Sequence, residues 1–381
     1  MGMMMYAVQL PKRVVFGGGM EEKIGAEAKG LGATKALIVT DETMQRLGLC
    51  GRVETPLKEV VEVDIFDAVA SEPTLDDAEL VASAARADYD MIVGVGGGSV
   101  LDMAKVAAAA AANPEQQASD FLGANKIAKP SVPKIFIPTT AGTGAEATPF
   151  ALVIVEGKKK AIASPYNLAD VVFIDAAFTA TMPPRITAST GMDALSHAVE
   201  AFLSLGANPL TDSFALEAIR KITDNLEEAF VHGDNLDARL KLSLAAMLAG
   251  MAFGNAGVIA GHAIAHTLGA RYKIPHSVSA ALALPYVMAY NAPAVKEKLA
   301  KVARELGEPG LSEEEAASWT VARVKSLLEK LDLPTGLSDV DVPKEDLPAL
   351  ADAVVKEKGY LARNPRAVEL EDAVKILEGM R

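Results

Sequence analysis

Short β-rich apolar segments alternate with helical segments over the first 182 residues of this 381-residue chain. The apolar segments include KALIVTD, YDMIVGVGGG, KIFIPTT and DVVFIDA, and helical stretches such as DDAELVASAARA lie between them. Strands that alternate with helices build βαβ units, in which successive strands lie parallel. The apolar runs are continuous, as expected for strands that helices cover on both faces. The pattern predicts an α/β domain with a parallel sheet.

The β-rich signal ends near the segment TMPPRITAST, residues 181–190. The Pro183-Pro184 pair supports a break there, because proline ends a strand or opens a helix. Long helical segments follow, and they include residues 210–230, 238–253, 295–307 and 313–332. A prior of roughly 150 residues per domain also favours two domains in a chain of this length. We therefore predict an α/β domain over residues 1–182 and an all-helical domain over residues 183–381.

Composition limits the partners and the compartment. Half of the residues are hydrophobic and 23% are charged, which is typical of a soluble globular protein. The net charge of −13 argues against nucleic acid and against an anionic membrane surface, because both require a concentrated basic face. The single cysteine, Cys50, excludes an intramolecular disulfide. We expect it to be a small buried hydrophobe in a reducing compartment.

The first residues, MGMMMYAVQLPKRVVFGGG, do not resemble a secretory signal, because they lack a cleavage site of small residues. No uninterrupted apolar run reaches the ~18 residues that a membrane span requires. The sequence therefore favours a cytoplasmic protein without a membrane segment.

A glycine-rich turn connects a strand directly to a helix in IVGVGGGSVLDMAK, at Gly96-Gly97-Gly98-Ser99. Glycines let a backbone approach a ligand closely, and the free N–H groups at a helix N-terminus form an anion site. The motif is neither the G-x-G-x-x-G fingerprint nor a Walker A loop. By itself the turn is equally well explained as a tight connection between two elements.

A second turn of this kind favours a ligand site over a tight connection. The segment IPTTAGTGAEAT, residues 137–148, again leaves a strand and supplies hydroxyl groups and open backbone amides. Two such turns in one α/β domain favour a dinucleotide site, with the diphosphate at the carboxyl ends of the strands. Asp41, at the end of another strand, can accept hydrogen bonds from a ribose diol and would repel a 2′-phosphate. We therefore predict NAD rather than NADP; the alternative role of Asp41 is a helix N-cap.

The segment GMDALSHAVEAF, residues 191–202, predicts an amphipathic helix with Asp193 and His197 four residues apart. Positions i and i+4 share a helix face, so the two side chains can bind one ion or form one hydrogen bond. The spacing by itself favours the simple hydrogen-bonded pair. Whether it forms an ion site depends on the other histidines.

Three more histidines lie in GHAIAHTLGARYKIPH, where His262 and His266 are four residues apart and His276 is the last residue. Two of these three, together with Asp193 and His197, would make a site of three nitrogens and one oxygen with positions open for substrate. Spacing does not say which two. This ligand set suits Fe(II), Zn, Co, Ni or Mn.

Together these motifs resemble the iron-containing (group III) alcohol dehydrogenase family. The segments FGGG, GGGSVLDMAK, IPTTAGTGAEAT, TGMDALSHAVEAF, NPLTD, HAIAHTLGARYKIPH and NPR occur in family order along nearly the whole chain. Within the family, the sequence is most similar to the lactaldehyde reductase and 1,3-propanediol dehydrogenase branch. The resemblance implies a Rossmann-like NAD-binding domain, an all-helical metal-binding domain and an active site in the cleft between them. It also suggests a homo-oligomer, a dimer or larger.

The resemblance assigns roles to individual residues. It implies Fe(II), with Zn(II) or another divalent metal as an alternative, held by Asp193, His197, His262 and His276. It places His266 near the nicotinamide as a catalytic, proton-relay candidate. It implies cofactor contacts from Gly97, Gly98, Ser99, Asp102, Thr139, Thr140, Thr143 and a lysine of the 158–160 run, for which we select Lys159.

Several positions depart from the usual family pattern, namely Glu72, Ser277 and Tyr286. None of them removes a predicted ligand, but they bear on substrate choice and on cofactor contacts. Three aromatic residues are expected pocket walls by position, although each could also be an ordinary core residue: Phe150, Phe253 and Tyr360.

The predicted reaction is the reversible oxidation of a short primary alcohol or diol to the aldehyde, with hydride transfer to NAD. A glycerol dehydrogenase-like oxidoreductase and a dehydroquinate synthase-like lyase are the alternative enzymes. The lyase would need a set of basic residues for a phosphorylated acidic substrate, and we find no such set near the histidine motifs.

Overall fold

The computed structural model describes residues 5–381, which divide into two compact units. One unit comprises residues 9–182, and the other comprises residues 183–381 together with residues 5–8. The division of the chain falls between Met182 and Pro183, where Pro183 is the N-cap of a long helix. The prediction that the first residues are not a secretory signal rests partly on residues 1–4, which lie outside the described part of the chain.

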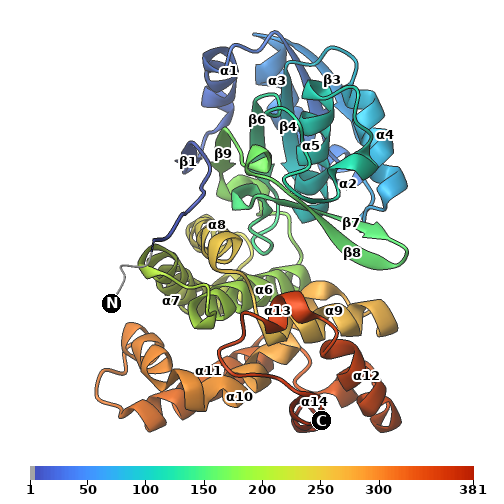
Figure 1. The fold of residues 1–381 in the computed structure, drawn as a ribbon. Coiled ribbons are helices and arrows are strands. Elements are labelled where there is room, and N and C mark those ends of the chain that lie inside the picture. Colours follow the sequence, from blue (N-terminus) through green and yellow to red (C-terminus); the bar gives the residue numbers. More distant parts are fainter. Residues whose placement is uncertain (1–4) are drawn as a thin grey trace. The chain divides into compact units, whose positions relative to one another are not determined.

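A six-stranded sheet with only parallel pairings forms the centre of the first unit (Figure 1). Its strands follow the order β1 (Val14–Phe16), β9 (Val171–Ile174), β6 (Lys134–Pro138), β4 (Met91–Gly96), β2 (Lys35–Val39) and β3 (Glu62–Phe66). The chain passes from β2 outward to β3 and then returns to the other side of β2 as β4. Ligands of open α/β sheets bind at the carboxyl ends of the strands at such a reversal.

Helices cover the sheet: α1 (Glu21–Gly30), α2 (Glu42–Arg46), α3 (Leu49–Lys58), α4 (Leu75–Ala85) and α5 (Gly98–Ala112). One face of the sheet forms a core with α1 and α3, in which Ile24 and Val53 pack with Val93. Cys50 is fully buried in this core, and burial raises the pKa of its thiol to about 12. The cysteine therefore packs as a hydrophobe.

A smaller three-stranded sheet belongs to the same unit. It contains β5 (Gly123–Ala124), β8 (Lys158–Ala163) and β7 (Phe150–Val155), and β7 and β8 form an antiparallel hairpin. Short 3₁₀ turns lie at Ala118–Phe121, Ala145–Ala147, Pro165–Asn167 and Ala176–Phe178.

The second unit has only helices and helical turns as regular structure among the described residues, and no strand occurs among them. It contains α6 (Pro184–Leu203), α7 (Pro209–Val231), α8 (Leu236–Ala256), α9 (Ala260–Tyr272), α10 (His276–Glu305), α11 (Glu313–Lys330), α12 (Leu347–Val354), α13 (Lys358–Leu361) and α14 (Leu370–Gly379), with 3₁₀ turns at Leu337–Val340 and Lys344–Asp346. Helix α6 packs against α7, α8 and α10, so its side chains are buried along most of its length. The predicted fold class, a parallel α/β region followed by a helical region, is confirmed.

Helix α10 is long and apolar enough to cross a membrane by length and composition, and the bent pair α8 and α9 passes the same test if it is counted as one span. However, 61% of the apolar window of α10 is buried inside the structure. Buried apolar residues along a helix are also what a core helix of a soluble protein shows.

Candidate metal centre and cofactor turns

Asp193 and His197 lie on the same face of α6, and their side chains are 2% and 6% exposed. The distance from His197 Nε2 to Asp193 Oδ1 is 4.0 Å, which is too long for a hydrogen bond between those two atoms. The simple hydrogen-bonded pair that the spacing favours therefore does not form through these atoms. Instead, both side chains face two further histidines.

The start of α9 supplies His262, and α10 begins with His276. His276 Nε2 lies 3.9 Å from Asp193 Oδ1, and the ring centroids of His197 and His262 are 4.7 Å apart. Asp193, His197, His262 and His276 each offer one ligand atom, and these four atoms lie within 4.8 Å of one another. The packing of α9 and α10 against the α6 region thus gathers three imidazoles around one carboxylate.

This group, which we call the histidine cluster, fits a divalent metal ion. Asp193 Oδ1 is buried and accepts no hydrogen bond from any described residue. A buried carboxylate oxygen without a donor costs free energy, which a bound cation would offset. Three nitrogens and one carboxylate oxygen are ligands that Fe(II), Zn(II) and related metals accept.

His266 lies one turn further along α9, and the structure does not include it in the four-residue group. Its ring centroid is 5.4 Å from that of His276, and its ring nitrogens are each 3.3 Å from Tyr360 Oη of α13. Burial raises the pKa of Tyr360, so its hydroxyl keeps its proton and can donate it in a hydrogen bond. His266 and Tyr360 thus form a polar pair beside the cluster.

The three predicted pocket aromatics have different surroundings. The Phe253 ring stacks on the ring of His197, with centroids 4.3 Å apart and planes 17° apart. Tyr360 contacts His266, so both aromatics of the helical unit lie against histidines of this region. Phe150 belongs to β7 of the α/β unit, where its carbonyl accepts a hydrogen bond from Lys105.

The two glycine-rich turns lie against each other in the α/β unit. Thr139 N donates to Gly96 O over 3.0 Å, and a Cβ atom placed on Gly98 would lie 2.9 Å from Thr143 Oγ1. Any side chain at position 98 would therefore collide with the second turn. Thr140 lies further from Gly97, with its Cγ2 3.4 Å from a Cβ placed there, which is close to an ordinary van der Waals contact.

These turns fit an anionic ligand. Gly97 is the N-cap of α5 and supplies no side-chain cap, so the N–H groups of the first turn at Gly98 and Ser99 are not capped by it. The hydroxyl of Thr139 is buried and has no hydrogen-bond partner among the described residues. Helix N-terminal amides and an unpaired hydroxyl are suitable donors for a diphosphate.

Asp41, Asp102 and Lys159 each have a partner within the α/β unit. Asp41 is the N-cap of α2 and accepts a hydrogen bond from Met44 N over 3.0 Å. Lys159 lies in the β7–β8 hairpin, 3.4 Å from Glu72. The carboxylate of Asp102 accepts from Lys105 Nζ and from the backbone of Leu152. Asp102 therefore joins α5 to β7, whatever its role toward a cofactor.

The sequence analysis did not single out Glu200, which is 1% exposed and bonds His262 Nδ1 over 2.8 Å. A signal existed, because Glu200 follows Asp193 by seven residues and positions i, i+4 and i+7 share one helix face. It also omitted Lys105, whose ammonium group is completely buried.

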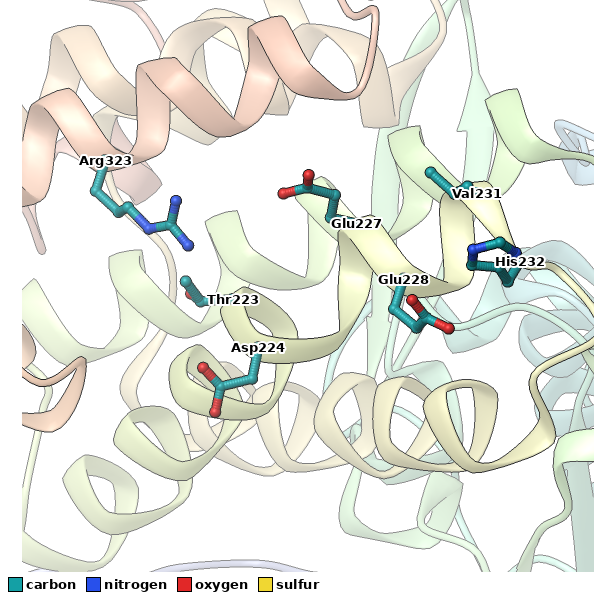
Figure 2. A pocket seen from close by; sticks show the side chains of 7 residues that line it. All are labelled: Thr223, Asp224, Glu227, Glu228, Val231, His232 and Arg323. Atoms are coloured by element: carbon teal, nitrogen blue, oxygen red, sulfur yellow. The ribbon is translucent and has the colours of Figure 1, made fainter.

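A groove with a volume of about 630 Å³ lies between α7 and α11 (Figure 2). Its lining is mostly charged, and it includes the fifth histidine, His232, and Arg323 of α11. No member of the histidine cluster lines it. The groove is therefore separate from the candidate metal site.

Two family models match this chain. The model described as iron-containing alcohol dehydrogenase matches residues 11–176, and the model of the C-terminal region of the Fe-containing alcohol dehydrogenase family matches residues 187–380. The chain belongs to the iron-containing alcohol dehydrogenase family. The family resemblance inferred from the motifs is thus confirmed, and the protein is an oxidoreductase of that family.

Curated relatives of the enzyme carry different names. It is 38% identical to long-chain-alcohol dehydrogenase 1 of Geobacillus thermodenitrificans (strain NG80-2), over 93% of this chain and 92% of the relative. It is also 38% identical to the lactaldehyde reductase of Escherichia coli (strain K12), over 95% of this chain and 96% of the relative.

Solved structures share its fold. A 1,3-propanediol oxidoreductase structure superposes with a TM-score of 0.94 at 36% identity, covering 99% of this chain and all of the other. A sulfoacetaldehyde reductase from Bifidobacterium kashiwanohense, solved in complex with NAD⁺, gives a TM-score of 0.90 at 27% identity and covers 99% of both chains.

Proposed function

We propose that this enzyme catalyses the reversible transfer of hydride between NAD(H) and a short primary alcohol or diol, with the aldehyde as the oxidised product. The observation that carries the proposal is the histidine cluster, in which four ligand atoms lie within 4.8 Å of one another. Asp193, His197, His262 and His276 would hold Fe(II), with Zn(II) or another divalent metal as the alternative. When bound, the metal supplies Lewis acidity toward the substrate oxygen.

The α/β unit would bind the cofactor through its two glycine-rich turns. Gly97, Gly98 and Ser99 would receive the diphosphate at the N-terminus of α5. The hydroxyl groups of the second turn would contact the cofactor, and they belong to Thr139, Thr140 and Thr143. Asp41, at the carboxyl end of β2, would accept hydrogen bonds from the ribose diol, which favours NAD over NADP.

His266 would move the proton. In the oxidation, bound NAD would accept the hydrogen of the carbinol C–H bond together with its electron pair, as a hydride. The hydroxyl proton leaves at the same time, and a ring nitrogen of His266 would accept it. The Tyr360 hydroxyl, 3.3 Å from the ring nitrogens, would orient His266 by accepting a hydrogen bond from the nitrogen that carries the imidazole proton.

We propose a C3 alcohol or aldehyde, such as propanediol or lactaldehyde, as the substrate. The similarity to the lactaldehyde reductase and to the 1,3-propanediol oxidoreductase structure supports this choice. Equal identity to a long-chain-alcohol dehydrogenase makes long primary alcohols the second candidate. The Phe253 ring, stacked on His197, would form one apolar wall for either chain length. We also propose a cytoplasmic homo-oligomer.

The decisive assay is NADH oxidation by metal-stripped enzyme under anaerobic conditions. Short aldehydes from C1 to C4 and long-chain aldehydes are compared, each with and without added Fe(II) or Zn(II). Activity that Fe(II) restores and that is highest with C3 aldehydes supports the proposal. Highest activity with long-chain aldehydes would shift the substrate assignment. If none of the aldehydes were reduced, whichever metal was added, the dehydrogenase function would be refuted.

A further inference from the structure

Glu200 connects two ligand-bearing helices inside the helical unit. It lies on α6, three residues after His197, and only 1% of its surface is exposed. One of its oxygens, Oε1, is 2.8 Å from His262 Nδ1. The other, Oε2, accepts from the backbone N–H of Ile259 over 2.7 Å and from that of His262 over 3.3 Å.

The two carboxylate oxygens of Glu200 have different roles. Helix α9 begins at Ala260, and its N-cap residue Ile259 has no side chain that can cap the helix. Oε2 satisfies the N–H groups at this helix start, which is a structural role. Oε1 faces only the imidazole, so it has no part in capping the helix.

The contact at Oε1 determines the tautomer of His262. An ionised carboxylate only accepts hydrogen bonds, so the proton of a neutral imidazole must be on Nδ1. The lone pair is then on Nε2, which is the ring nitrogen left to act as a ligand in the histidine cluster. A partner that donated to Nδ1 would move the proton to Nε2 and remove this lone pair.

We propose that Glu200 is a positioning residue that holds His262 in the Nδ1–H tautomer and thereby makes Nε2 a metal ligand. This inference rests on the proposed function, because it assumes that the histidine cluster binds a metal. The sequence around Glu200 is adapted to the contact, since a side chain at Gly261 would collide with the Glu200 carboxylate. The absence of a side chain at position 261 lets the carboxylate approach both the helix start and the ring.

The variant Glu200→Gln separates the two roles. Two backbone N–H groups face Oε2 and a single ring nitrogen faces Oε1, so the amide oxygen takes the backbone side. The amide NH₂ group then donates to Nδ1 and forces the Nε2–H tautomer. The variant therefore keeps the helix cap, but Nε2 of His262 is no longer available as a ligand. A purely structural role of Glu200 predicts unchanged metal binding by this variant, whereas a positioning role predicts weaker binding.

The first measurement is ¹⁵N NMR of the five histidine rings in metal-free protein at pH 8.5, where neutral imidazoles show which nitrogen carries the proton. The His262 signal is assigned by its loss in His262→Gln. We expect the Nδ1–H form in the wild type and the Nε2–H form in Glu200→Gln. An Nε2–H ring in the wild type would overturn the inference even if the variant did not fold.

The second measurement is the dissociation constant for Fe(II) and Zn(II), determined by competition with a chelator. Loss of a partner that orients a ligand histidine typically weakens metal binding about 10- to 100-fold, and we expect this for Glu200→Gln. Ser196→Ala is the matched control, because Ser196 is buried on the same helix and bonds only Met192 O among the contacts that the structure shows. It should bind metal like the wild type.

The outcomes distinguish the two proposals. A wild-type protein that takes up no metal would refute the proposed function. A wild type and a Glu200→Gln variant that bind metal equally well would refute only the role of Glu200. Equal melting temperatures of the two metal-free proteins, together with weaker metal binding by the variant, would support the positioning role.

Discussion

The Lys105 ammonium group lies 3.1 Å from the Asp102 carboxylate, and no part of the Lys105 side chain is exposed. Lys105 also donates to Thr148 Oγ1 and to the carbonyl of Phe150, while Asp102 accepts from Leu152 N. The pair therefore ties α5, which begins at the first glycine-rich turn, to the chain that leaves the second turn. Burial lowers the pKa of Lys105, and Asp102 opposes that shift by favouring the charged ammonium.

Lys105→Met should destabilise the protein by about 3–5 kcal/mol, because it leaves the Asp102 carboxylate buried without its cation. The free energy of unfolding is measured by urea denaturation, and the dissociation constant for NADH by fluorescence titration. We expect weaker NADH binding as well, because the link between the two turns is broken. The double variant Lys105→Met/Asp102→Leu removes both charges and should regain most of the lost stability. No difference between the single and double variants would contradict the coupling.

Glu146 makes the stability of the protein depend on pH near neutrality. It is 2% exposed in the second glycine-rich turn, and burial raises its pKa from 4.5 to about 7, although Lys105 opposes the shift. The folded state therefore holds the proton more tightly than the unfolded state. The stability that the folded state gains from this tighter binding of the proton is fully present below about pH 4.5 and is lost as the pH rises through about 7.

Glu146→Gln keeps the shape of the neutral acid and cannot ionise. Between pH 5 and pH 8 the wild type should lose on the order of 3 kcal/mol of unfolding free energy relative to this variant. Urea denaturation of both proteins across that range measures the difference. Parallel stability curves for the two proteins would show that Glu146 is ionised equally in the folded and unfolded states.

Asp193→Asn should remove metal binding, because it replaces the only carboxylate of the histidine cluster with a neutral amide. We expect the dissociation constant for Fe(II) to rise by at least about 100-fold, beyond the range for residues that only orient a ligand. In the wild type, metal at about 100 times its dissociation constant should add about 2.7 kcal/mol of stability. Calorimetry with and without a chelator should show this gain for the wild type and for Ser196→Ala, and no gain for Asp193→Asn.

Asp41→Asn should widen the cofactor preference without destabilising the protein. Asp41 caps α2 through its bond to Met44 N, and asparagine caps helices as well as aspartate does. The substitution removes the negative charge that would repel a 2′-phosphate. We expect kcat/KM with NADPH to rise about 10-fold, which corresponds to ~1.4 kcal/mol, at an unchanged melting temperature. A drop in melting temperature without a gain with NADPH would mean that Asp41 only caps the helix.

The local parts of this protein were predictable from the sequence. Continuous apolar runs between helices identified a parallel sheet, because strand and helix periods are set by residues close together in the chain. For the same reason, the four-residue spacing of Asp193 and His197 placed both on one helix face. The family resemblance then implied which two residues complete the predicted ligand set, a choice that spacing alone left open among His262, His266 and His276.

Only the tertiary structure decided how these parts meet. The packing of α9 and α10 near α6 brings His262 and His276 to Asp193, whereas His266 contacts Tyr360. The same packing places the Glu200 carboxylate against His262, 62 residues further along the chain. Helix periodicity determines which residues share a face. It does not determine which faces pack together, because that depends on burial and hydrogen bonding over the whole helical unit.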